Sequence, residues 1–79
     1  MTTLLPERQR TARMYPLEVV LHWAPTTGHE LDGGTDVHAL TDGGLAVAFA
    51  RAWDTPNTHD LRVLAVAQAR RWGEVESAG

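Results

Sequence analysis

The stretch LRVLAVAQARRW, residues 61–72, decides the fold, because it fits two kinds of secondary structure. Its alanines favour a helix, which Asn57 and Asp60 would begin and Gly73 would end. At about 100° per residue, however, the charged and amide side chains would scatter around the whole circumference of that helix. A period of two gathers the apolar side chains on one side much better. We therefore favour a strand here, and a helix over residues 58–72 stays open as the alternative.

The segments before it show a similar alternation. LAVAFARAW, residues 45–53, has a large side chain at every second position and four alanines between them. YPLEVVLHW, residues 15–23, alternates in the same way, and TDVHAL, residues 35–40, is long enough for a short strand. A period of two is typical of strands, so each segment is predicted to be one.

The triplet Asp-Gly-Gly occurs twice, at residues 32–34 and 42–44. Paired glycines after an aspartate are typical of turns, and TDGG between VHAL and LAVAF fits a hairpin loop. A phosphate-binding loop needs a lysine that the chain lacks, and no glutamate closes an EF-hand. Both triplets are therefore predicted to be turns.

These segments together predict a mainly β protein. The expected fold is an antiparallel four-strand meander that forms a small sheet or an open barrel, with an N-terminal arm. The alternative is an α+β fold in which residues 58–72 are helical. In either case we expect an arm at residues 1–14, a single globular domain at 15–72 and a polar tail at 73–79.

The composition excludes several kinds of chemistry. The 79 residues include no cysteine and no lysine, which excludes disulfides, thiolate-bound zinc and Schiff-base catalysis. The lone serine, Ser77, lies in the predicted tail. We therefore expect a protein that is not an enzyme and that has no cofactor.

Arginine supplies all seven positive charges, and alanine, glycine and valine are abundant. This bias is typical of GC-rich coding and predicts an origin in a high-GC bacterium or its phage. The longest apolar run is too short to span a membrane, and the N-terminus has no apolar signal core. A cytoplasmic protein without membrane contact is expected.

Six residues are predicted to bind a partner because arginine and tryptophan are enriched at the energetic centres of protein interfaces. Each tryptophan ends a predicted strand, and two of them follow arginines. Tryptophan also closes the ends of a small core, and this structural interpretation stays open beside the first. The predicted binding residues are Trp23, Arg51, Trp53, Arg70, Arg71 and Trp72.

Two functions follow from these patterns. The first is a small non-catalytic protein-interaction module, an accessory or regulatory factor that binds and modulates a larger, unidentified protein. The alternative is a nucleic-acid-binding regulator that uses Arg8, Arg10 and Arg13 of the arm and stacks tryptophan on bases. The acidic segment at 15–50 and the basic arm also suggest pairing of two copies in a homodimer.

The four histidines are candidate metal ligands. His22, His29, His38 and His59, with nearby acids at Glu30, Asp32 and Asp36, offer suitable nitrogen and oxygen donors. No two histidines have the close spacing of known metal sites. The sequence therefore predicts surface histidines and no metal site.

Overall fold

Helices form the whole regular structure of residues 12–75, the part of the chain that the computed structural model describes. The elements are η2 (Ala12–Met14), α1 (Leu17–Trp23), η3 (Val37–Ala39), α2 (Asp42–Asp54) and α3 (Thr58–Arg71), where η denotes a 3-10 helix. Within these residues the β pairing amounts to one isolated bridge, between Glu30 and Asp36. The predicted mainly β meander is wrong.

The correction applies to every predicted strand. The segment 15–23 contains α1, 35–40 contains η3, 45–53 lies in α2, and 61–72 forms most of α3. The alternative of a helix over 58–72 is confirmed by α3, whereas the sheet that the α+β alternative kept is absent from residues 12–75.

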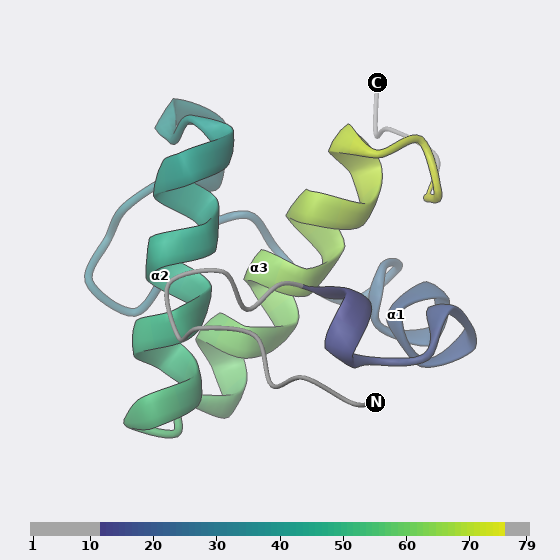
Figure 1. Cartoon of the computed structure of the whole chain (residues 1–79), viewed down its shortest axis with the longest axis horizontal. Helices are drawn as coiled ribbons and strands as arrows, with labels where there is room; N and C mark the ends of the chain where they lie inside the picture. The colour runs from purple at the N-terminus through teal and green to yellow at the C-terminus, as the bar shows by residue number, and fades with distance from the viewer. Residues whose placement is uncertain (1–11, 76–79) are drawn as a thin grey trace, which may run out of the picture.

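The position of α3 explains why the period of two in residues 61–72 wrongly predicted a strand. In Figure 1, α3 passes between α2 on one side and α1 on the other, and it also contacts η2 and η3. A helix covered on nearly all sides has no single apolar stripe, so a 3.6-residue period cannot be detected in it. Its buried residues are Leu61, Val63, Leu64, Ala65, Val66, Ala67, Gln68 and Ala69.

The two ends of α3 carry the caps that the helical alternative required. The side chain of Asn57 accepts a hydrogen bond from the backbone N–H of Asp60 at 3.1 Å. At the other end Gly73 has φ +75°, and the N–H of Glu74 donates to the carbonyl of Ala69 at 2.9 Å. This pattern, with Gly73 N–H bonded to the Arg70 carbonyl, is a Schellman motif. The caps at Asn57 and Gly73 are confirmed, whereas the Asp60 carboxylate accepts the N–H of Asp32 and not that of Asn57.

The second Asp-Gly-Gly triplet begins a helix instead of forming a hairpin loop. Thr41 is the N-cap of α2, and its hydroxyl oxygen accepts the N–H of Gly44 at 3.0 Å. A Cβ on Gly44 would lie 3.3 Å from that oxygen and 3.6 Å from Leu40 Cβ, so glycine lets the cap approach closely. Asp42 in the first turn adds a favourable charge at the helix N-terminus.

The first triplet does form a turn. Gly34 has φ +89°, which favours glycine, and its N–H donates to the Leu31 carbonyl at 2.8 Å. Beyond the turn, the N–H of Val37 donates to the carbonyl of His29 at 2.9 Å. The chain therefore reverses, and residues 29–30 run beside residues 36–37.

An aromatic cluster joins α1, α2 and the segment before α1. The ring of Tyr15 lies 5.0 Å from Trp23, 6.0 Å from Phe49 and 5.8 Å from Trp53, measured between centroids. The near-perpendicular arrangement of Tyr15 on Trp23 and Phe49 is favourable for aromatic pairs. Burial raises the pKa of the Tyr15 phenol above its usual value, and the charge of Arg62 opposes this in part.

We expect Tyr15 to ionise above its ordinary pKa of about 10. The folded state then holds the phenolic proton more tightly than the unfolded chain, so this contribution to stability is complete below about pH 10. It is lost as the pH rises through the folded-state pKa. Because Tyr15 is the chain's single tyrosine, phenolate absorbance reports it alone.

Tyr15→Phe serves as the control, since it keeps the ring and removes the titrating group. Its melting temperature should be less sensitive to pH in the same alkaline range. A phenolate midpoint at or below about 10 in the folded protein would contradict the burial of this ring.

Candidate functional site

A groove of about 820 Å³ lies between α2 and the segment that precedes it. Leu31, Leu40 and Val47 give it apolar walls, and Val47 is 41% exposed although it is a large hydrophobic residue. Gly43 and Gly44 leave part of the wall without side chains. The groove can therefore accept an apolar side chain from outside.

Arg51 supplies a positive charge at this groove. It lines the groove from α2, it is exposed, and its guanidinium has no hydrogen bond or ion pair among residues 12–75. A strand would have put Arg51 and Trp53 on one face, but residues two apart on a helix differ by roughly 200°. Trp53 accordingly packs on Phe49 and Tyr15, away from this arginine. The two residues therefore lie on different faces of α2, and their predicted binding to a partner stays a prediction.

The three tryptophans are half-buried and pack against the core. The arginines over them come from distant parts of the sequence. Arg62 lies 5.5 Å from the Trp23 ring, and Arg13 lies 4.1 Å from the ring of Trp72, both within range of a cation–π contact. The tryptophans thus have intramolecular roles, whereas their predicted binding to a partner stays a prediction.

The arginines of the predicted nucleic-acid arm are only partly described. Arg13 also forms an ion pair with Glu74 at 3.4 Å, which links η2 to the end of α3. Arg8 and Arg10 lie outside the described residues. The structure therefore leaves this alternative as a prediction.

Arg71 holds three segments together at the C-terminal end of α3. Its guanidinium donates to the carbonyls of Val37 and Leu40 and to the carboxylate of Asp42, the last at 2.9 Å. These bonds fix η3 and the start of α2 on α3. The side chain that was predicted to bind a partner is therefore engaged within the chain.

Arg70 borders a second cavity, of about 270 Å³, together with Val37, His38 and Ala67. Its Nε atom is buried and has no hydrogen-bond partner among residues 12–75. Arg70 as a whole is half-exposed, and its predicted binding to a partner stays a prediction.

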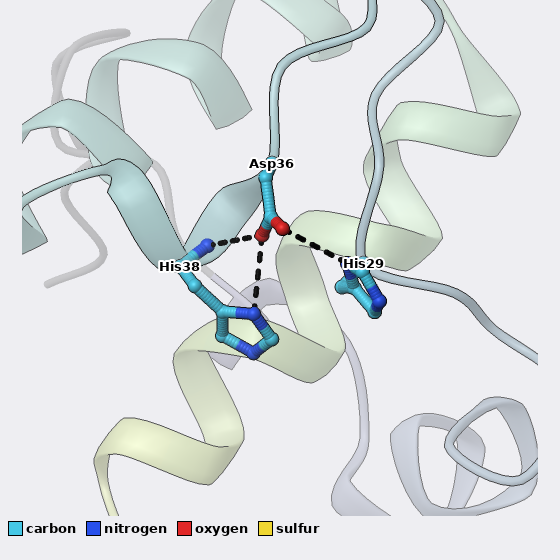
Figure 2. Close-up of side chains that lie close together, drawn as sticks. All are labelled: His29, Asp36 and His38. Atoms are coloured by element: carbon cyan, nitrogen blue, oxygen red, sulfur yellow. Dashed lines mark hydrogen bonds and ion pairs between the residues drawn. The ribbon is translucent and has the colours of Figure 1, made fainter.

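Two histidines meet one carboxylate on the 28–39 segment. Figure 2 shows Asp36 between the rings of His29 and His38. Its two oxygens lie 3.3 Å from His29 Nδ1 and 3.1 Å from His38 Nδ1, and the rings are 5.0 Å apart. The turn at residues 31–34 makes this possible, because it returns the chain to His29.

Hydrogen bonding stabilises the charged form of the Asp36 carboxylate. The backbone N–H of His38 donates to its Oδ1 at 2.8 Å, and this bond is the main reason why the pKa of Asp36 lies below its usual value. The charges of His29 and His38 and a hydrogen bond from His29 lower the pKa further, while desolvation opposes them. The arrangement places one carboxylate between two imidazoles, with a different oxygen facing each ring.

A second group of possible ligands, Asp32, His59 and Asp60, lies at the N-terminus of α3. Its carboxylates already accept structural hydrogen bonds. Asp60 accepts the N–H of Asp32 at 2.9 Å, and Asp32 accepts the side-chain amide of Asn57 at 2.9 Å. His59 Nε2 lies 3.0 Å from the Glu30 carbonyl. This group fastens the 30–32 loop to α3.

No protein-family model matches the chain, and no curated protein or solved structure shows significant similarity to it. Among residues 12–75, no helix has both the length and the apolar character needed to cross a membrane.

Spacing along the sequence did not identify the pair His29 and His38. The two residues are nine positions apart, whereas the spacing rules for metal ligands describe a single helix or a short loop. The predicted turn at residues 32–34 nevertheless indicated that these histidines could meet, because a turn there places residue 29 opposite residues 37 and 38. His22 lies apart from them, in the last turn of α1.

We expect Arg71→Met to destabilise the fold by about 1–3 kcal/mol, because two backbone carbonyls lose a charged hydrogen-bond donor. Chemical denaturation measures this change. Arg51→Met, on the open groove, is the matched control and should stay within about 0.5 kcal/mol of the wild type. Equal effects of the two substitutions would show that Arg71 does not hold these segments.

Proposed function

We propose that the protein is a non-catalytic binding module that docks a segment of a larger protein in the groove beside α2. The observation that carries the proposal is the combination of an exposed apolar side chain, Val47, with the unpaired guanidinium of Arg51 in one groove. An accessory or regulatory role, in which binding modulates the larger protein, fits a module of this size.

The groove indicates the chemistry of the segment that it fits. An apolar side chain can contact Leu31, Leu40 and Val47, while a carboxylate one or two residues away can pair with Arg51. Arginine holds a carboxylate through two parallel hydrogen bonds, which adds directional specificity to the apolar contact. We therefore expect an acidic, partly apolar segment as the ligand.

The α2 side of the groove is suited to such docking. Its residues belong to a helix capped at Thr41 and held at its start by Arg71, so little ordering is required on binding. Preorganisation of this kind lowers the entropic cost of association. The proposal thus relies on a surface that is already formed.

The test uses partners captured from the native host with the wild-type chain and then measured one at a time. Arg51→Ala should weaken the binding of the authentic partner by about 1–2 kcal/mol while leaving the melting temperature nearly unchanged. Val47→Asp should weaken it further, because it places a like charge beside the acidic segment.

Arg62→Ala is the matched control, since it removes an exposed arginine that does not line the groove. It should bind the partner as the wild type does. Wild-type affinity in both groove variants would contradict the proposal. Capture of nucleic acid with a steep loss of affinity at higher salt would support the arm alternative instead, and a second copy as sole partner would support the homodimer.

A further inference from the structure

We propose that His29, Asp36 and His38 form a binding site for a divalent transition metal ion, with Zn²⁺ as the ion that fits best. The site is independent of the groove beside α2. It is carried by the distances among three donor atoms, by the donor types and by the way in which the backbone holds the two histidines together.

The distances fit a metal as well as they fit hydrogen bonds. Zinc bonds to imidazole nitrogen and to carboxylate oxygen are about 2.0–2.1 Å long, so two ligand atoms of a tetrahedral site lie about 3.3 Å apart. His29 Nδ1 lies 3.3 Å from Asp36 Oδ2, and His38 Nδ1 lies 3.1 Å from Asp36 Oδ1, so each imidazole is at a ligand-to-ligand distance from one oxygen of the carboxylate. One atom from each of the three side chains lies within 4.8 Å of the others. Small side-chain rotations therefore suffice to close the site on one ion.

The donor set selects the class of ion. Two imidazoles and one carboxylate suit zinc and neighbouring transition metals, whereas Ca²⁺ and Mg²⁺ prefer oxygen donors alone. Three protein ligands leave at least one coordination position for water or an outside group. All three side chains are substantially exposed, at 58% for His29, 46% for Asp36 and 70% for His38, so an ion can reach them from solvent.

The backbone holds the ligands in place before any ion binds. The N–H of Val37 bonds to the His29 carbonyl, so the two ligand-bearing segments are paired directly. Arg71 fixes the carbonyl of Val37 on α3, and Asp36 caps η3 through the N–H of His38. That cap leaves the second oxygen of Asp36 facing His29. A preformed site of this kind needs little rearrangement to bind.

The second group, Asp32, His59 and Asp60, serves as an internal comparison. Its carboxylates accept hydrogen bonds that fasten a loop to α3, and binding an ion there would break them. The proposal therefore predicts one bound ion per chain and assigns it to the first group.

The test is a calorimetric titration of the full, untagged chain with ZnCl₂, together with thermal melts. The wild type should bind one zinc ion, and its melting temperature should rise by about 10–20 °C at a free zinc concentration of about 100 times the Kd. His29→Ala and His38→Ala should each weaken binding at least about tenfold. Asp36→Asn, which keeps an oxygen able to cap η3, should weaken binding without unfolding the protein.

His22→Ala is the matched control, because His22 lies in α1 outside both groups, and it should bind zinc as the wild type does. The imidazole nitrogen resonances add a direct readout, since the Nδ1 signals of His29 and His38 should shift on addition of zinc. No zinc binding by the wild type would overturn the proposal. So would loss of binding in His22→Ala, or unchanged binding in both His29→Ala and His38→Ala.

Discussion

The burial of α3 on nearly all sides is the constraint on which the rest of the structure depends. In so short a chain, one central helix gives every other element an apolar surface to cover, and α1, α2, η2 and η3 all contact it. Leu64, Ala65 and Val66 are fully buried, and small side chains at several positions let the neighbours approach closely. Burying a side chain such as Leu64 contributes about 1.5–3 kcal/mol. The two ends of α3 also organise the loops, through Asp60 at its start and Arg71 at its end.

The helix caps and one turn of this fold could be predicted from the sequence, because each depends on a local hydrogen bond. Asn57, Gly73 and the turn at Gly34 act as the sequence indicated. The type of secondary structure could not be predicted from the sequence. The period of two in 45–53 and 61–72 comes from alternating alanine, which packs equally well on a buried helix. Tertiary packing decided between a strand and a helix in these segments. Gly43 and Gly44 are ambiguous in the same way, because paired glycines are compatible with a hairpin loop and also with the first turn of a capped helix.

The candidate sites were predicted only in part, because tertiary packing also determines which of their residues meet. The sequence predicted Arg51 and Trp53 as binding residues, but their separation on different faces follows only from the helix. The pairs that arginine does form with Trp23 and Trp72 join residues far apart in sequence. The meeting of His29 and His38 likewise depends on a chain reversal and on the position of η3 against α3. Contacts that form through tertiary packing cannot be predicted from the spacing of residues along the sequence.

Native-state amide hydrogen exchange tests the central position of α3 most directly. If α3 is the element that all others cover, the slowest-exchanging amides should lie within residues 64–69 and should open only with global unfolding. Amides of the short helix α1 should exchange faster, through local opening. The account would be contradicted if the amides of α3 exchanged faster than those of α1 and α2, because that helix would then be peripheral to the stable core.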